Sequence, residues 1–241
     1  SAGSDRALAT LLRDLGPRLR RGSAPPEEPV ARDPVGLPAV DRLLGGGVPR
    51  GRLVEIAGPP SSGRTALALG WLARLTRAGE FAAVVDPADA LDPPSAAGAG
   101  VVLPRVLWVR APGLPEALRA TERLIDARGF ALVLLDLDAS DAEAASDAPA
   151  RGTRADAARA DVRDAAWLRL ARAAASARTS LLLLSTHRRA GTFSDLALEL
   201  RPSGARFSTA PALLEGLESR AVLVRNRLGP PGQESPWVLS A

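Results

Sequence analysis

The sequence lacks several residue types, and each absence narrows the kinds of protein it can encode. There is no cysteine among the 241 residues, which excludes disulfide bonds and thiolate metal sites. A single histidine, His187, argues against a zinc site. No apolar run approaches the roughly 20 residues that a membrane span needs, and the start of the chain does not resemble a signal peptide. We therefore expect a cytoplasmic protein that does not contact a membrane.

Lysine, methionine and tyrosine are also absent, and asparagine occurs once, at Asn226. All 31 basic residues are therefore arginine, the net charge is +4, and the sequence pI is about 11.0. A basic excess favours acidic partners such as nucleic acid. A composition dominated by Ala, Arg, Gly and Pro is also what a GC-rich genome produces, so this excess is only weak support for nucleic-acid binding. With 46% hydrophobic and 24% charged residues, the chain reads as an ordinary globular protein.

The chain divides into three predicted parts. Residues 1–23 contain an amphipathic helix that we expect to mediate oligomerisation, residues 24–34 form a Pro/Glu-rich linker, and residues 35–241 form the core. The leucines that recur at helical spacing in the first part are Leu8, Leu11, Leu12, Leu15 and Leu19. The helix can pack on its own domain or on a neighbour, and the long linker favours docking onto a second subunit.

Short apolar strands alternate with helices through the first half of the core. The strands are expected at 53–57, 81–86, 106–109, 131–136 and 180–185, and the helices at 65–77, 114–128 and 162–177. Strands then predominate, at 196–200, 206–209, 221–225 and 237–239, whereas 138–161 reads as a mobile loop with some helix from its alanines. This alternation predicts an α/β fold with a mostly parallel, twisted sheet flanked by helices and extended along one edge.

The most specific local motif is the octapeptide from Gly58 to Thr65, Gly-Pro-Pro-Ser-Ser-Gly-Arg-Thr. It follows a predicted strand and opens a predicted helix, which is the context of a phosphate-binding loop. The glycines let successive backbone N–H groups converge on phosphate oxygens, and the N-terminus of the helix adds positive potential. The residues expected to bind the nucleotide here are Gly58, Ser61, Ser62, Gly63, Arg64 and Thr65. A glycine-rich turn without a ligand is the alternative.

Two further positions bear on this prediction. Arg64 stands where the motif has lysine; a guanidinium can neutralise phosphate and form bidentate bonds, but it is planar and bulkier than an ammonium group. Asp136 ends an apolar run and is expected, with the Thr65 hydroxyl, to hold Mg²⁺. A turn or capping role is the alternative for Asp136.

Several segments resemble RecA, in the same order along the chain. Residues 51–56 lead into the phosphate loop as they do in RecA, 86–93 resemble Asp-Ala-Glu-His-Ala-Leu-Asp-Pro, and 224–228 resemble Val-Lys-Asn-Lys-Ile. The opening helix is similar to the RecA helix that docks onto a neighbouring subunit. The resemblance implies a RecA-like P-loop NTPase core that uses ATP and Mg²⁺, without the separate C-terminal domain of RecA.

The departures from RecA concern catalysis and DNA binding. Ala88 replaces the glutamate that activates water, and an alanine cannot accept a proton. Ser95 replaces the adenine-stacking tyrosine, although Asp92 is retained as a nucleotide-binding residue. Thr186 matches part of the RecA sensor pair, and the second DNA-binding loop that follows is shortened to 187–192. We therefore expect weak DNA-dependent ATP hydrolysis if any.

The resemblance also assigns arginines to two surfaces. Arg225 and Arg227 match the two lysines that reach a neighbour's nucleotide across a RecA filament interface. The DNA-binding candidates are Arg188 and Arg189 in the shortened second loop, with Arg151 and Arg154 in residues 138–161, which correspond to the first DNA-binding loop of RecA. For all of these an ordinary solvated surface is the alternative. Contact with DNA would be made mainly to phosphates and would not depend on sequence.

Among RecA relatives, these losses are most similar to the ImuA type, which assists translesion synthesis. The resemblance implies an ATP-binding DNA-repair accessory protein of the SOS response that self-associates, binds DNA and contacts a translesion polymerase accessory protein. Two alternatives remain open: an active DNA-dependent ATPase or recombinase, and a structural interaction module without nucleotide.

Overall fold

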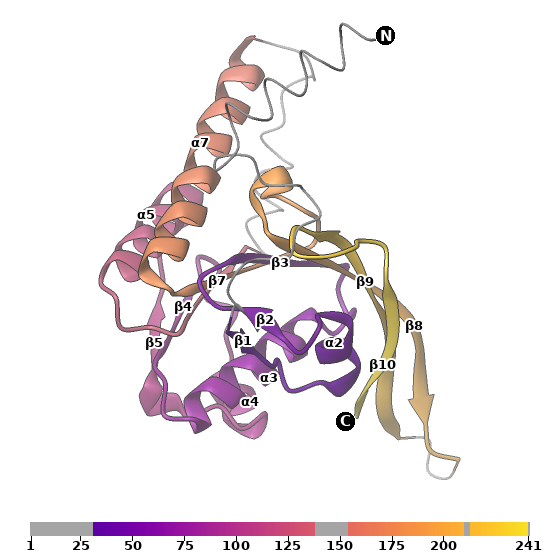
Figure 1. Ribbon diagram of the computed structural model, residues 1–241. Coiled ribbons are helices and arrows are strands. Elements are labelled where there is room, and N and C mark those ends of the chain that lie inside the picture. The colour runs from indigo at the N-terminus through magenta and orange to yellow at the C-terminus, as the bar shows by residue number, and fades with distance from the viewer. Residues whose placement is uncertain (1–30, 138–153, 210–212, 241) are drawn as a thin grey trace, which may run out of the picture. The chain divides into compact units, whose positions relative to one another are not determined.

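The computed structural model describes residues 31–137, 154–209 and 213–240, and Ala31–Ala241 form one compact unit (Figure 1). The predicted N-terminal helix, residues 24–30 of the predicted linker, and Arg151 lie outside the described residues. The end of the linker is in a strand, because β1 (Arg32–Asp33) pairs antiparallel with β2 (Val48–Pro49).

Eight strands form the main sheet, in the order β10-β9-β8-β3-β7-β6-β4-β5. Six are parallel, and β9 and β10 extend the β8 edge in antiparallel register. The strands are β3 (Leu53–Ala57), β4 (Ala82–Val85), β5 (Val106–Val109), β6 (Leu132–Asp136), β7 (Ser180–Ser185), β8 (Leu196–Phe207), β9 (Leu214–Asn226) and β10 (Glu234–Ser240). The predicted mostly parallel sheet is confirmed.

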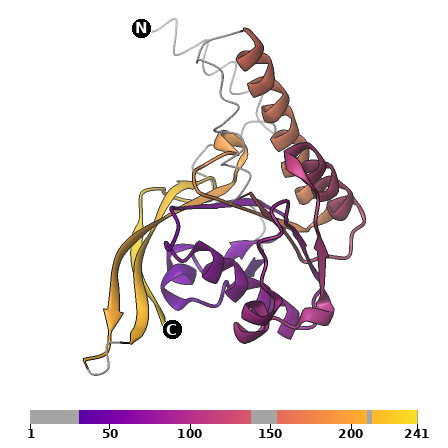
Figure 2. The ribbon, with the colours of Figure 1, turned by 180° about the vertical axis from the view of Figure 1, so that it is seen from behind.

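Helices cover both faces of the sheet (Figures 1 and 2). One face packs under α2 (Pro38–Leu43), α3 (Arg64–Arg77) and α4 (Pro93–Gly98), and the other under α5 (Gly113–Asp126) and α7 (Arg154–Ala177). Short 3₁₀ turns span Leu103–Arg105 and Gly191–Phe193. No helix in the described part of the chain is both long and apolar enough to span a membrane.

The largest differences from the predicted bounds are in β8, β9 and α7. The strands expected at 196–200 and 206–209 are one strand, β8, because the polar residues between them pair with β9 in a long hairpin. The loop expected at 138–161 already contains the start of α7, which begins at Arg154. An alanine-rich stretch has high helix propensity even without an apolar period, and α7 adds the apolar Trp167, Leu170 and Ala174 further along to anchor it.

Candidate functional site

The loop from Gly58 to Gly63 joins the central strand β3 to α3, and its two glycines are sterically required. A β-carbon on Gly58 would lie 2.5 Å from the Ser62 Oγ and 2.7 Å from the Leu200 carbonyl oxygen. Gly63 has φ of 86°, a left-handed conformation that side chains disfavour, and a β-carbon there would lie 2.5 Å from the Trp237 ring. The loop is therefore a tightly curled backbone turn.

Donors at this turn suit a phosphate group. The N-cap residue of α3 is Gly63, which has no side chain to cap the first amides of the helix. The Ser62 Oγ is buried and has no hydrogen-bond partner among the described residues, whereas Ser61 and Thr65 are exposed. A phosphate accepts hydrogen bonds from such amide and hydroxyl donors at a helix N-terminus. The residues present therefore fit the phosphates of a nucleotide.

Arg64 folds back onto this loop. The residue is only 6% exposed, and its Nη1 donates a hydrogen bond to the Gly58 carbonyl oxygen. The guanidinium charge therefore lies against the loop and does not extend into solvent. Sequence reasoning identified the Lys-to-Arg change but not this inward conformation.

Thr65 and Asp136 both lie at the carboxyl edge of the parallel strands. Asp136 ends β6, which is separated from β3 by β7 alone, and Thr65 is the second residue of α3. A hydroxyl and a carboxylate are oxygen ligands of the kind that Mg²⁺ takes, usually together with water and substrate phosphates. The described residues contain no cluster of three or more acidic or histidine side chains that would hold a metal by itself.

The segment around Ala88 is held by the buried Asp86. Its carboxylate accepts hydrogen bonds from the Ala90 amide at 3.1 Å, the Leu91 amide at 2.8 Å and the Trp108 Nε1 at 3.2 Å. Asp86 thus fixes the backbone that carries Ala88, whose side chain has no carboxylate.

The nearest carboxylate, on Asp89, is already paired. Its Oδ1 lies 2.7 Å from the Arg110 Nε, and the Arg110 guanidinium stacks 4.0 Å from the centroid of the Trp108 ring. Asp89 is therefore paired with Arg110, the residue that directly follows β5, and its carboxylate is already engaged.

Asp92 has a structural partner of its own. Its Oδ2 accepts a hydrogen bond from the Ser95 amide at 2.9 Å and caps α4. Hydrogen bonds from the Ser95 side chain and backbone lower the pKa of Asp92 below its ordinary value. The nucleotide-binding role of Asp92 stays a prediction.

The shortened loop between β7 and β8 is tied down by Glu55, which sequence reasoning missed. Glu55 is fully buried on β3, and its Oε1 accepts hydrogen bonds from the Arg189 amide and, at 2.9 Å, from the Ala190 amide. Its Oε2 lies 3.6 Å from the Arg188 Nε. A glutamate inside the apolar run Leu53–Ala57 was the available signal, because a buried charge requires a partner.

The far end of this loop is held by Arg225. Its Nε donates to the Ser194 carbonyl at 2.6 Å and its Nη2 to the Thr192 carbonyl at 2.8 Å. Arg227 lies 3.7 Å from the Asp195 carboxylate. Both predicted interface arginines therefore have partners within the chain. The backbone of Arg154 starts α7, and its side chain is not described.

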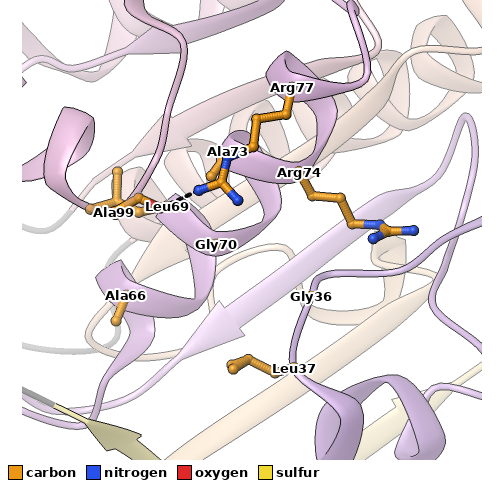
Figure 3. Close-up of a pocket in the computed structure, with 9 residues that line it drawn as sticks. All are labelled: Gly36, Leu37, Ala66, Leu69, Gly70, Ala73, Arg74, Arg77 and Ala99. Atoms are coloured by element: carbon orange, nitrogen blue, oxygen red, sulfur yellow. Dashed lines mark hydrogen bonds between the residues drawn. The ribbon is translucent and has the colours of Figure 1, made fainter.

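Two cavities flank the site. One of about 330 Å³ lies between the start of the phosphate loop and the shortened loop, and is lined by Ala57–Pro59, Thr186–Arg188 and Glu199–Arg201. The other, of about 560 Å³, is an apolar groove along α3 with Arg74 and Arg77 at its rim (Figure 3). None of the predicted site residues lines the groove. The lining of the first cavity shows that the phosphate loop lies next to the shortened loop between β7 and β8.

A curled loop between a central parallel strand and a helix, in a sheet covered on both faces, defines the class of P-loop α/β nucleotide-binding folds. Residues 17–183 match the RecA N-terminal domain family, and the chain belongs to that family.

Three RecA proteins illustrate the similarity. The chain is 38% identical to Protein RecA of Clavibacter michiganensis over 142 residues, which are 56% of this chain and 39% of that protein. It is 39% identical to Protein RecA of Picosynechococcus over 107 residues, 44% of this chain and 31% of that protein. The identity with Protein RecA of Tropheryma whipplei is 42% over 104 residues, 43% of this chain and 24% of that protein. The chain thus spans less than half the length of these curated relatives.

Proposed function

We propose that this protein is an ATP-binding DNA-repair accessory protein of the SOS and translesion-synthesis type, with at most weak DNA-stimulated ATP hydrolysis. One contrast carries the proposal. The phosphate loop keeps both sterically required glycines and its hydroxyl residues, whereas Ala88 stands where RecA has its glutamate and the nearby Asp89 is paired with Arg110. Binding is therefore favoured over turnover.

ATP with Mg²⁺ is the proposed cofactor. The uncapped start of α3 and the buried Ser62 hydroxyl support phosphate binding, and Thr65 with Asp136 would hold the metal ion. Bound Mg²⁺ would neutralise phosphate charge. Positioned charge can accelerate phosphoryl transfer without a dedicated base, which is why slow hydrolysis is expected and not its complete absence.

DNA is the proposed macromolecular partner, bound through phosphates by Arg188, Arg189, Arg151 and Arg154. Arg188 faces the buried Glu55 and donates to the Gly191 carbonyl at 3.1 Å, so DNA phosphates would compete with these partners. The short, tied loop does not favour the recombinase alternative, because both of its ends are held by Glu55 and Arg225.

Self-association and a translesion polymerase accessory protein complete the proposed partners. The N-terminal helix would dock onto a neighbour, and Arg225 and Arg227 would reach that neighbour's nucleotide. The open edge of the sheet at β5 supports self-association, since Phe81 and Leu107 are exposed beside it. A DNA partner implies a cytoplasmic location.

The deciding measurement is ATP binding and phosphate release, with and without single-stranded DNA, for wild-type protein, Thr65→Ala and the control Thr209→Ala. Thr209 is exposed and distant in sequence from the phosphate loop. We expect T65A to weaken Mg·ATP binding by about tenfold or more, because it removes a proposed metal ligand, whereas T209A binds as wild type.

Each outcome selects one of the three functions. Slow release that DNA stimulates and T65A abolishes supports the accessory role, as does binding without release. Rapid DNA-dependent release would favour the recombinase alternative. A wild-type protein that binds no ATP would leave the structural module.

A further inference from the structure

Trp237 lies on β10, three strands away from β3, yet its indole ring contacts the phosphate loop. A β-carbon on Gly63 would lie 2.5 Å from Cη2 and 2.7 Å from Cζ2 of this ring. The ring thus occupies the space that any side chain at position 63 would need. Trp237 is 5% exposed, so the contact is part of the interior.

The curvature of the sheet brings these two residues together. Figure 1 shows β8, β9 and β10 curling around the side of the sheet that carries α2 and α3. Trp237 pairs in register with Ser219 of β9, and it belongs to the same buried cluster as Leu67 of α3 and Leu200 of β8. The antiparallel strands therefore reach the loop from the face on which α3 packs.

The same half of the sheet also meets the other glycine of the loop. The Leu200 carbonyl of β8 would lie 2.7 Å from a β-carbon on Gly58. The strands β8 and β10 thus contact the two ends of the loop, and both follow residues 17–183, which match the family. Close-packed interiors resist displacement, so these contacts restrict the conformations of the loop.

We propose that Trp237 is a positioning residue for the phosphate loop: its six-membered ring holds Gly63 in the left-handed conformation from which α3 begins. The proposal rests on the proposed nucleotide function and adds a residue to it. The ring acts through the loop backbone and does not contact the ligand. If the first amides of α3 are held in place before the ligand binds, the entropic cost of ordering them on binding is smaller.

The ring, and not the indole N–H, carries this role. Trp237 Nε1 is buried and has no hydrogen-bond partner among the described residues, and an unsatisfied buried donor opposes folding. Phenylalanine removes this donor and keeps an aromatic ring, but its ring is attached directly to Cβ and falls short of the position of Cζ2 and Cη2. Trp237→Phe is therefore expected to retain part of the support of the loop, whereas Trp237→Ala removes it.

The first test is amide hydrogen exchange across residues 58–65 in the nucleotide-free protein. We expect W237A to speed exchange there by about tenfold and W237F to stay within about threefold of wild type. The control is Trp71→Ala, which removes the same side chain from the same buried cluster but not from the neighbours of Gly63. W71A is expected to leave exchange in the loop close to wild type when the proteins are compared at equal margins below their melting temperatures. Trp237→Leu replaces W237A if that variant does not fold.

ATP titration of the same variants gives the second readout. W237A is expected to weaken ATP binding by about tenfold, with W237F and W71A within about threefold of wild type. Wild-type exchange and affinity in folded W237A or W237L would overturn the positioning role alone, and equal losses in W71A would overturn it as well. Wild-type protein that binds no ATP would instead overturn the proposed function.

Discussion

Glu55 decides how the shortened loop after β7 is held. The carboxylate is fully buried on β3, three residues before the phosphate loop begins at Gly58. It accepts hydrogen bonds from the amides of Arg189 and Ala190 and faces Arg188. The Gly58 amide in turn donates to the Ser185 carbonyl at 3.2 Å. The two loops that the sequence assigns to nucleotide and DNA are therefore joined by hydrogen bonds at their bases.

We expect Glu55→Ala to lower the free energy of unfolding by about 3–5 kcal/mol, because it leaves buried amides and a partly buried guanidinium without their acceptor. Urea unfolding measures this loss. Glu199→Ala is the matched control, since its ion pair with Arg201 is on the surface and such pairs contribute below about 1 kcal/mol. Equal small losses in both variants would contradict the role given to Glu55.

The helix α4 and the β8–β9 hairpin are stabilised in different ways. The helix α4 has six residues and no buried side chain except Ala96, so its ends matter more than its packing. Proline at its start and the Asp92 cap define where it begins. The β8–β9 hairpin depends on backbone pairing instead. Its outer half is exposed, so the hydrogen bonds between the two strands hold it in place.

The Asp92 cap predicts a pH dependence confined to acid. Hydrogen bonds from Ser95 lower the pKa of Asp92 in the folded protein, so the cap stabilises the fold above the unfolded pKa of about 3.9 and is lost as pH falls through the lower folded pKa. Asp92→Ala should lower the melting temperature at pH 7, and the difference from wild type should shrink at about pH 3. Thermal melts across this range measure it. A difference that stays constant with pH would show that the carboxylate charge has no part in the cap.

The whole molecule divides its sheet between two tasks. The parallel strands carry the phosphate loop, Asp136 and the shortened loop at one edge, as the carboxyl ends of parallel strands commonly do. The antiparallel strands β9 and β10 extend the sheet and bring Trp237 against the loop. The proposed association with other copies of the chain would use residues 1–23, which are separate from this sheet in the sequence.

Self-association through the N-terminal helix predicts that Leu11→Asp lowers the mass measured by light scattering. A charge within the leucine stripe opposes burial of that face against a neighbour. Arg13→Asp is the control, because Arg13 lies outside the leucine stripe in the sequence. An unchanged mass for L11D, or an equal loss for R13D, would count against docking by the leucines.

Much of the fold follows from the sequence because its strands and helices are marked by local patterns. Five of the six parallel strands are short apolar runs, and α3 and α5 appear within one or two residues of their predicted bounds. The phosphate loop was predicted for the same reason, since its strand, glycines and helix are contiguous. The long β8 and the early start of α7 were missed, because pairing partners and tertiary packing override weak local signals.

The sequence by itself determined the α/β class and the position of the phosphate loop, because each depends on neighbouring residues, and it predicted that Ala88 replaces a catalytic glutamate. Only the tertiary structure decided that Arg64 folds onto Gly58, that Glu55 holds the loop at Arg188, and that Trp237 rests on Gly63. These contacts join residues on different strands and loops, or depend on the conformation of a buried side chain. No periodicity along the chain encodes them, since they arise from strand order and from the curvature of the sheet.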